Sequence, residues 1–326
     1  MSSEPKRLNL ARKYRPSSLA DLSGQSNVVR ILTEALKKDR IAPAYLLSGP
    51  RGVGKTSTAR ILAKAASCLG PEDENRPCGK CKACKALENG NLMDIVEIDG
   101  ASHTGVDDVR SIIEAISYRP SVGKKNVYII DEVHMLSNAA FNALLKTLEE
   151  PPSHALFIFA TTEPEKLPST VLSRVQRLEL RRLHERDIMS SLESIVEKEK
   201  IKISKAILEQ IAAAADGSLR DAQTLLEQML LLSGAEQVSQ EVVDSFLGTI
   251  GTEQEIEILE LISKSDQKAI LSKVYEFYEK GKDLTKLLDR LVNWSRVMLI
   301  TKSCGPEFLE SEVPPQYSQR LLESFA

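Results

Sequence analysis

A glycine-rich segment is the first part of the sequence whose residue types and spacing could do chemistry. It reads Gly49-Pro50-Arg51-Gly52-Val53-Gly54-Lys55-Thr56 and is followed by Ser57. In such a loop, backbone N–H groups surround phosphates, and the positive N-terminal end of the following helix attracts the same anion. Lys55 would contact the β- and γ-phosphates, and the Thr56 hydroxyl would ligate Mg²⁺. The segment therefore predicts a binding site for a nucleoside triphosphate and Mg²⁺.

Two acids follow an apolar stretch further along the chain, in the sequence NVYIIDE. Asp131, at the end of a predicted strand, would hold Mg²⁺ directly or through water, and Glu132 would activate the attacking water. Thr161 ends another apolar stretch and would lie beside the γ-phosphate, because ligands lie off the carboxyl ends of parallel strands. An acidic strand end alone could merely begin a loop, but together with the P-loop it indicates hydrolysis.

Four of the five cysteines are close together in the sequence. Two C-x-x-C steps share Cys81, and with Cys68 upstream the set Cys68, Cys78, Cys81 and Cys84 can surround a tetrahedral Zn²⁺. An iron–sulfur cluster is the alternative, since three cysteines at this interval resemble a ferredoxin run, although no Cys-Pro follows. The N-terminal residues have no apolar core typical of an export signal, so disulfides are not expected. The spacing favours structural zinc over an iron–sulfur cluster.

The elements that would position these residues alternate up to about residue 180. Residues 44–48, 93–98, 126–131 and 155–161 are short and rich in β-formers, and the predicted helices 56–66, 106–116 and 138–148 lie between them. This alternation predicts an α/β fold with a parallel sheet covered by helices on both faces. From residue 185 onward the apolar spacing predicts helices only. We therefore expect one α/β domain, a small helical domain and a helical C-terminal part.

The composition sets limits on the class of protein. Of 326 residues, 42% are hydrophobic, and 43 Lys and Arg nearly balance 46 Asp and Glu, for a net charge of -3. A strongly basic nucleic-acid-binding chain is excluded, so any DNA contact must come from a local basic surface or from an assembly. No apolar run approaches the roughly 20 residues of a membrane span. We expect a cytoplasmic protein with no membrane partner.

Several long motifs occur in one order between about residues 8 and 250. They are LARKYRPSSLADLSGQ, AYLLSGPRGVGKTSTARILAKA, VYIIDEVHMLSNAAFNALLKTLEEPP, FIFATTEPEKLPSTVLSRVQ and GSLRDAQTLLEQ. With them the chain resembles AAA+ ATPases, and more narrowly the gamma/tau subunits of bacterial DNA polymerase III clamp loaders. The resemblance implies an AAA+ domain at 1–180 with a zinc module at 68–84, a helical lid at 181–246 and a collar-type domain at 247–326. The collar would be incomplete and the polymerase-binding tail of tau absent, which leaves open whether this chain forms a stable pentamer.

The resemblance also assigns roles to single residues around the nucleotide. Tyr14, Arg15 and Pro16 would line the adenine pocket, and Thr161 would be the sensor 1 residue. Arg174 would be an arginine finger inserted into the ATP of a neighbouring subunit, where it would stabilise charge on the transferred phosphoryl group. Arg220 would be the sensor 2 residue, reaching from the lid to the γ-phosphate of its own site.

The activity implied by the resemblance is ATP-driven loading of a sliding clamp onto primer–template DNA. The implied partners are delta-type and delta-prime-type subunits, further gamma/tau copies, the clamp and the DNA. Arg110, Lys146 and Thr170 would face the DNA backbone, with phosphate contacts and no base reading. A DNA helicase is the runner-up, since Asp131 begins a D-E-x-H box, but a helicase needs a second parallel-sheet domain. A scaffold that binds ATP without turnover is disfavoured by Glu132.

Overall fold

The computed structural model describes residues 9–71, 76–88, 93–102, 104–234, 238–246, 250, 252–305 and 321. The chain divides into two compact units, Met1–Gln228 and Met229–Ala326. In the part of the chain described, no helix has both the length and the apolar character needed to cross a membrane.

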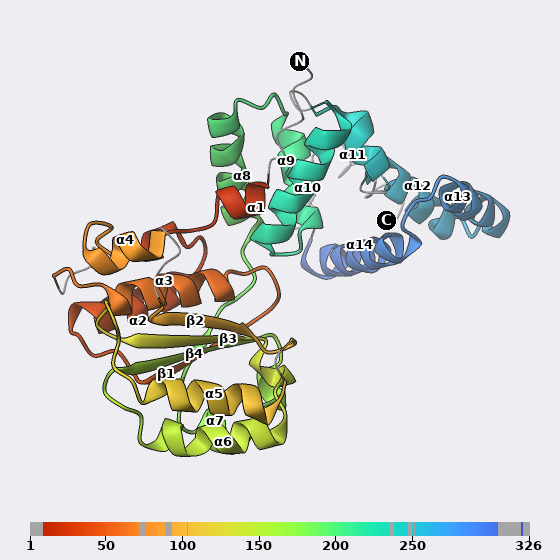
Figure 1. The fold of residues 1–326 in the computed structure, drawn as a ribbon. Coiled ribbons are helices and arrows are strands. Elements are labelled where there is room, and N and C mark those ends of the chain that lie inside the picture. Colours follow the sequence, from red (N-terminus) through yellow and green to blue (C-terminus); the bar gives the residue numbers. More distant parts are fainter. Residues whose placement is uncertain are drawn as a thin grey trace. The chain divides into compact units, whose positions relative to one another are not determined.

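The first unit is built on a five-stranded parallel sheet (Figure 1). Its strands are β1 (Ala44–Ser48), β2 (Ile95–Asp99), β3 (Asn126–Asp131), β4 (Ala155–Thr161) and β5 (Gln176–Glu179), in the order β2-β3-β4-β1-β5. The central strands are buried along nearly their whole length and mostly apolar, because both faces of the sheet are covered.

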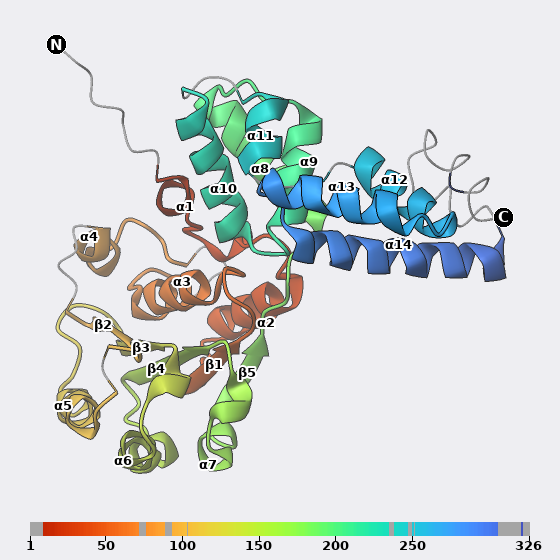
Figure 2. The ribbon, with the colours of Figure 1, turned by 90° about the vertical axis from the view of Figure 1, so that its right-hand side faces the viewer.

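Helices cover both faces of this sheet (Figures 1 and 2). On one face lie α2 (Ser26–Lys37) and α3 (Lys55–Ser67), and on the other α5 (Val106–Ile116), α6 (Asn138–Glu149) and α7 (Ser169–Leu172). The core of the second face packs aromatic strand residues against aliphatic helix residues, including Phe157, Phe159, Ile112, Leu144 and Val171. Burial of this apolar surface is the main favourable contribution to the sheet's stability.

Shorter elements and a helical segment complete the first unit. The helix α1 (Leu10–Lys13) precedes the sheet, and α4 (Lys82–Glu88) follows α3. Three 3₁₀ turns, η1 (Leu19–Asp21), η2 (Val133–Met135) and η3 (Pro164–Lys166), lie in loops. After the sheet come α8 (Glu185–Glu199), α9 (Lys205–Ala214) and α10 (Leu219–Leu232), within which the first unit ends at Gln228. Ser204 begins α9 by accepting a hydrogen bond from the N–H of Ile207, which satisfies a donor that the helix leaves free.

The second unit is helical in its described residues. It contains α11 (Gln240–Phe246), α12 (Thr252–Ser263), α13 (Gln267–Glu279) and α14 (Leu284–Cys304). Its core includes Trp294, whose indole Nε1–H donates a 2.8 Å hydrogen bond to the buried carboxylate of Glu255. A buried indole needs such a partner, because an unpaired N–H away from water is costly.

The predicted fold class is confirmed: a parallel sheet with helices on both faces is followed by helices. One strand differs in its bounds from the prediction, since β2 begins at Ile95 and ends at Asp99 rather than covering residues 93–98. The reason is the ladder with β3, which pairs Ile95 with Val127 and Asp99 with Asp131 and leaves Met93 exposed. The predicted bounds of the three domains stay predictions.

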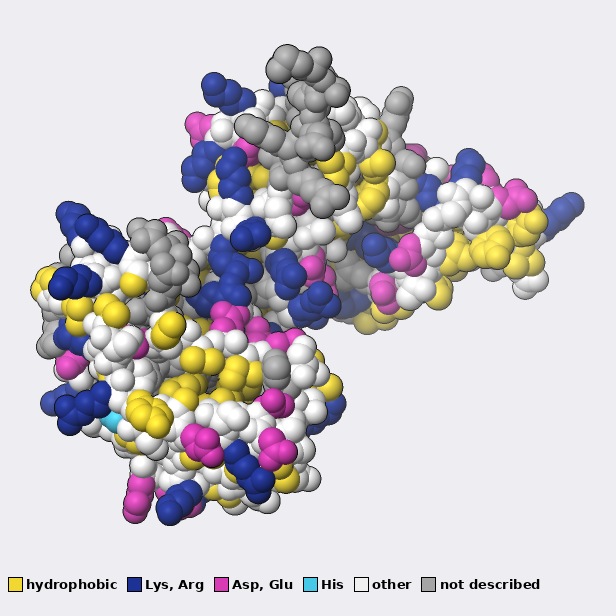
Figure 3. All heavy atoms as spheres, in the orientation of Figure 1, with side chains coloured by type: hydrophobic (Ala, Val, Ile, Leu, Met, Phe, Trp, Pro, Cys, Tyr) yellow, Lys and Arg dark blue, Asp and Glu magenta, His cyan; other side chains and the backbone are white. Residues whose placement is uncertain are grey.

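Basic and acidic side chains are interspersed over the face seen in Figure 3. This mixture agrees with the near balance of charges in the composition. On this face, nucleic acid would therefore have to bind at a local basic surface.

A buried carboxylate fixes the loop that precedes β3. Asp94 is 4% exposed and accepts hydrogen bonds from the N–H groups of Ser121 (2.6 Å), Val122 (2.8 Å) and Gly123 (2.6 Å), and from the Ser121 hydroxyl (2.7 Å). Burial opposes ionisation, but these four donors outweigh it and hold the pKa of Asp94 below its ordinary value.

We predict that Asp94→Asn lowers the thermal denaturation midpoint of the first unit, by an amount corresponding to about 1–3 kcal/mol near pH 7. Because the folded pKa is lowered, the stabilisation is present above the unfolded pKa and is lost as pH falls through the folded pKa. The difference in thermal denaturation midpoint between wild type and variant should therefore shrink as pH falls below about 4. Glu114→Gln, at an exposed acid of α5, is the control; an equal effect of both variants would contradict the prediction.

Candidate nucleotide and metal sites

The P-loop connects β1 to α3 and needs glycine at fixed positions. Gly49, Gly52 and Gly54 have φ angles of 143°, 78° and 104°, a backbone region that other residues rarely adopt. A Cβ at Gly49 would lie 2.2 Å from the carbonyl oxygen of Leu180, and one at Gly52 would lie 1.8 Å from the Ser218 hydroxyl. The loop is therefore packed directly against Leu180, after β5, and against Ser218, which precedes α10.

Lys55 points into the turn of this loop. Its side chain is buried, and the Nζ donates 2.8 Å hydrogen bonds to the carbonyl oxygens of Gly49 and Pro50. Burial lowers the pKa of Lys55, while the nearby carboxylates of Glu132 and Asp131 act in the opposite direction. The ammonium is thus held at the place where a phosphate would meet the loop's N–H groups.

The two residues predicted to bind Mg²⁺ contact each other directly. The Thr56 hydroxyl, at the start of α3, donates a 2.6 Å hydrogen bond to Oδ2 of Asp131 at the end of β3. The other carboxylate oxygen of Asp131 accepts from the N–H of Glu132 at 3.0 Å. Hydroxyl and carboxylate oxygens are the ligands that Mg²⁺ prefers, so the donor set fits this ion.

Glu132 turns the chain at the end of β3. Its backbone is left-handed, with φ 45° and ψ 46°, and its carboxylate Oε2 accepts from the N–H (3.3 Å) and hydroxyl (3.2 Å) of Thr162. A non-glycine residue in this region is uncommon and is found preferentially at functional sites. The predicted general base therefore bonds to the end of β4 in this conformation.

Thr161 is fully buried, and its hydroxyl contacts the side chain of His134. The Thr161 hydroxyl oxygen lies 2.9 Å from Nδ1 of His134 and accepts from the N–H of Glu163 at 3.0 Å. His134 was not among the predicted site residues, although its place three residues after Asp131 in the D-E-x-H box was the available signal.

A cavity of about 750 Å³ opens beside the P-loop. Its wall is formed by the N-terminal segment, the P-loop, the ends of β2 and β3, and α10. The predicted residues on this wall are Arg15, Pro16, Arg51, Gly52, Val53, Gly54, Lys55, Thr56, Ser57, Asp131, Glu132 and Arg220. Arg60 and Glu97, which were not predicted as site residues, lie on the same wall and form an ion pair with a 2.7 Å Nε–Oε2 bond. The volume and the basic lining suit a nucleoside triphosphate.

Four residues that were predicted to contact the nucleotide do not line this cavity. Gly49 and Pro50 contribute the carbonyls that hold Lys55, and the Thr161 hydroxyl bonds to His134 and Glu163. The Tyr14 hydroxyl donates to the carboxylate of Glu199 in α8. Burial and this carboxylate raise the pKa of Tyr14 to about 12. The predicted contact of Tyr14 with adenine stays a prediction.

Arg174 follows α7 and is also away from the cavity wall. Its guanidinium donates 2.6 Å hydrogen bonds to the Glu149 carboxylate and to the Thr170 carbonyl oxygen. A role in a neighbouring subunit's site does not require a place on this chain's own cavity, so the finger assignment stays a prediction.

The three residues predicted to face DNA lie on the helices of one face of the sheet. Arg110 is on α5, Lys146 on α6 and Thr170 on α7, and all three are exposed. Arg110 donates a 3.0 Å hydrogen bond to Asp107 on its own helix. The DNA contacts stay predictions.

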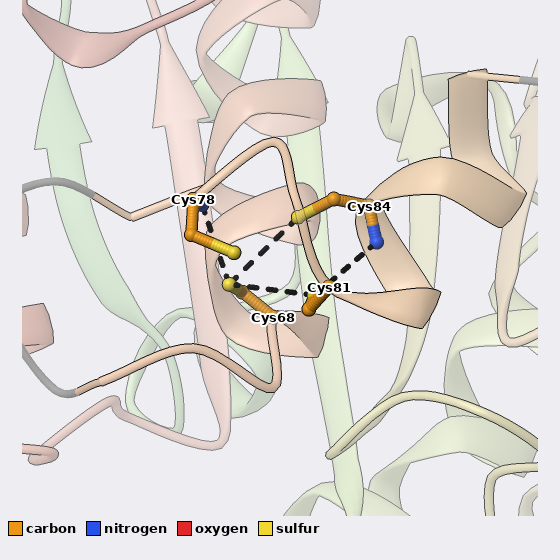
Figure 4. Close-up of side chains that lie close together, drawn as sticks. All are labelled: Cys68, Cys78, Cys81 and Cys84. Atoms are coloured by element: carbon orange, nitrogen blue, oxygen red, sulfur yellow. Dashed lines mark hydrogen bonds between the residues drawn. The ribbon is translucent and has the colours of Figure 1, made fainter.

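The four clustered cysteines converge on one point (Figure 4). All four Sγ atoms lie within 4.8 Å of one another, with Cys68 at 3.9 Å from Cys81 and 3.8 Å from Cys84. A tetrahedral ion with metal–sulfur bonds of about 2.3 Å places its sulfur ligands about 3.8 Å apart. The geometry therefore fits a single ion bound by four thiolates.

Backbone N–H groups surround these sulfur atoms. Gly70 and Cys78 donate to Sγ of Cys68, and Leu69 and Cys84 donate to Sγ of Cys81, at 3.3–3.4 Å. Burial opposes ionisation of Cys81, but the N–H groups of Cys84 and Leu69 outweigh it and lower its pKa to about 6. Donors around a sulfur favour the thiolate, which is the form that binds a metal.

The fold and the site together define a P-loop NTPase of the AAA+ class. The chain superposes on the Holliday junction branch migration motor RuvB of Thermotoga maritima with a TM-score of 0.54 and 24% identity, over 76% of this chain and 79% of that one. At this identity the likeness concerns the fold alone.

Sequence comparison narrows the class to one family. Residues 24–184 match the family described as DNA polymerase III, delta subunit, and residues 187–235 match the ATPase lid domain of the DNA polymerase III clamp loader subunit. The chain is 44% identical over 298 residues to DNA polymerase III subunit tau of Bacillus subtilis, covering 90% of this chain and 52% of that protein. It is 39% identical over 285 residues to DNA polymerase III subunit gamma of Buchnera aphidicola, covering 87% of this chain and 78% of that protein.

The chain belongs to the family of DNA polymerase III gamma/tau subunits. It spans about half the length of the Bacillus subtilis relative and more than three quarters of the Buchnera relative.

The cysteine site predicts stoichiometric zinc in the purified chain, with no iron, measured by inductively coupled plasma mass spectrometry. Cys81→Ser should lose most of the zinc and lower the thermal denaturation midpoint, because a closed four-thiolate site contributes folding free energy. Cys304→Ser, at the cysteine outside the cluster, should keep the zinc. Iron in place of zinc, or full zinc in Cys81→Ser, would show that the assignment is wrong.

The glycine requirement predicts that Gly52→Ala weakens nucleotide binding by at least about 10-fold, because the added methyl group meets the Ser218 hydroxyl. Gly281→Ala is the matched control, since Gly281 also has a positive φ of 66° but nothing within 4 Å of its would-be Cβ. The control should lose only roughly 1–2 kcal/mol of folding free energy, the cost of a non-glycine residue in the left-handed region, and should keep its nucleotide affinity. Titration with a fluorescent ATP analogue measures the nucleotide affinity of both variants, and equal affinities would refute the packing argument.

Proposed function

We propose that this chain is an ATP-hydrolysing clamp-loader subunit, which uses ATP to open a sliding clamp and place it on primed DNA during replication. The observation that carries the proposal is the single cavity in which the P-loop, the acidic end of β3 and Arg220 of α10 converge. Family membership supports the same conclusion.

In this proposal each residue of the cavity has a separate task. Lys55 and Arg220 contact the β- and γ-phosphates, and the oxygens of Thr56 and Asp131 hold Mg²⁺, which neutralises phosphate charge when bound. Glu132 takes a proton from the attacking water after its carboxylate leaves Thr162. Arg15 and Pro16 lie on the N-terminal part of the wall and take the adenosine end of ATP.

The contact between the P-loop and the start of α10 supports coupling of ATP binding to movement of the helical lid. Ser218 lies against Gly52, and Arg220 lies on the cavity wall two residues later. A γ-phosphate that draws Arg220 inward would shift α10 with it, and hydrolysis would release it. The difference in contacts between the ATP and ADP states then biases two lid positions.

Assembly enters the proposal through Arg174. Its guanidinium reaches the ATP of a neighbouring subunit after exchanging its bond to Glu149, so hydrolysis depends on correct neighbours. The neighbours are further copies of this chain and delta-type and delta-prime-type subunits, and the assembly grips the sliding clamp.

DNA contact in this proposal uses the backbone only. Arg110, Lys146 and Thr170, on adjacent helices of one face, would approach phosphates in the assembled ring. Binding should then be salt-sensitive and independent of base sequence.

Zinc would hold the segment between α3 and α4 together, with no part in hydrolysis, because four thiolates leave no open position. The helicase alternative finds no support in the described residues, since beyond Glu179 they form helices and no second sheet. An arginine-supplying second α/β domain is what a helicase of that class would need.

The proposal predicts low ATPase activity of the chain alone, measured by steady-state phosphate release, and a strong rise with partner subunits, clamp and primed DNA. Arg174→Ala should lower the assembled rate by at least about 100-fold without loss of ATP binding, because a trans-acting arginine stabilises only the transition state. Arg177→Ala, an exposed neighbour that donates to the Leu172 carbonyl, should leave the rate unchanged.

The opposite results are equally informative. A rate that the complete set of partners does not raise would contradict the clamp-loader function. A rate that falls equally in both arginine variants would contradict the finger assignment.

A further inference from the structure

His134 is a histidine next to the nucleotide site, in contact with Thr161 and close to Glu132, that the proposed roles have not used. It lies in η2, directly after the acids of β3, and its side chain is 7% exposed. A buried imidazole normally has partners for both nitrogens, and those partners set its tautomer.

Both ring nitrogens of His134 face defined groups. Nδ1 lies 2.9 Å from the Thr161 hydroxyl oxygen and 3.4 Å from Oε2 of Glu132, and Nε2 lies 3.1 Å from Oε1 of Glu163. One ring therefore contacts the predicted sensor threonine and the predicted general base at the same time.

The ring nitrogen of His134 that carries a proton can be assigned from the groups that can only accept hydrogen bonds. The Lys166 ammonium, 2.6 Å from Glu163, lowers the pKa of that carboxyl, so it is ionised near neutral pH and can only accept hydrogen bonds. Nε2 of His134 therefore carries a proton, and in the neutral ring Nδ1 is the acceptor for the Thr161 hydroxyl proton. The same Thr161 oxygen accepts from the N–H of Glu163 at 3.0 Å, so the direction of its hydroxyl is defined.

We propose that His134 is a positioning residue for ATP hydrolysis, which sets the direction of the Thr161 hydroxyl beside the Glu132 carboxylate. This inference rests on the proposed function, because it assigns to His134 a role in the same ATPase site. The imidazole follows the end of β3 and bonds to Thr161 at the end of β4, so the side chain expected near the γ-phosphate is held in one direction.

Simple packing is a poorer account of these contacts. An apolar side chain of similar size would fill the space, but it would leave the buried Thr161 hydroxyl without its ring partner. The two nitrogens also have different partners, so substitutions can separate them. An asparagine side chain reproduces the position of Nδ1 and can still meet Thr161, whereas glutamine reproduces Nε2 and can meet only Glu163.

The test compares His134→Asn and His134→Gln in the full chain assembled with partner subunits, clamp and primed DNA. Glu165→Gln, at an exposed acid of η3, is the control. Steady-state kcat and KM, the Kd for a non-hydrolysable ATP analogue and the thermal denaturation midpoint are measured for each. We expect His134→Gln to lose about 10- to 100-fold in kcat with KM and Kd within about 2-fold of wild type, the range for removal of a positioning contact. His134→Asn should recover most of the rate.

Three results would overturn the proposal while leaving the ATPase function in place. These are unchanged kcat in both variants, retained kcat in His134→Gln with loss in His134→Asn, and a fall in ATP-analogue affinity or in the denaturation midpoint that accounts for the lost rate. A wild-type assembly that hydrolyses no ATP would overturn the proposed function and this inference together.

Discussion

The contact on which the site depends is the 2.6 Å hydrogen bond between the Thr56 hydroxyl and the Asp131 carboxylate. It joins the first turn of α3 to the end of β3, so the helix that would receive the phosphates and the acid that would hold Mg²⁺ are fixed to each other. The parallel register extends this arrangement: Ser48 lies beside Thr161, and Asp99 lies beside Asp131, at one edge of the sheet. Because all five strands end at this edge, loops distant in sequence supply one cavity.

Polar contacts at this edge link the sheet to the helical segment that follows it. Gln25 is 4% exposed and pairs with the backbone of Arg181 in both directions, at 2.8 Å from its amide nitrogen and 3.2 Å to its amide oxygen. The N–H of Leu183 donates to the Gly217 carbonyl at 3.0 Å. The segment that carries Arg220 is thereby held against the P-loop, and the proposed coupling of nucleotide state to lid position would act through these contacts.

The sequence predicted those parts of the site whose chemistry is local. The P-loop, the acids after β3 and the cysteine cluster are short runs in which spacing alone brings the atoms together, and Cys68 and Cys84 do lie 3.8 Å apart. The contacts of His134 with Thr161, and of Tyr14 with Glu199, join residues that are 27 and 185 positions apart. No pattern along the chain reports such pairs, because strand register and helix packing decide them. The start of β2 was missed for the same reason, since its bounds depend on β3.

Hydrogen exchange measured by mass spectrometry tests the central claim most directly. The full chain carrying Glu132→Gln, which should bind ATP without turning it over, would be compared with and without ATP and Mg²⁺. The account predicts slower exchange in residues 49–57 and, at the same nucleotide concentration, in residues 217–223 at the start of α10, because one ligand contacts both. Protection of the P-loop without any change at 217–223, or no protection of either, would contradict a nucleotide site shared between the sheet and the lid.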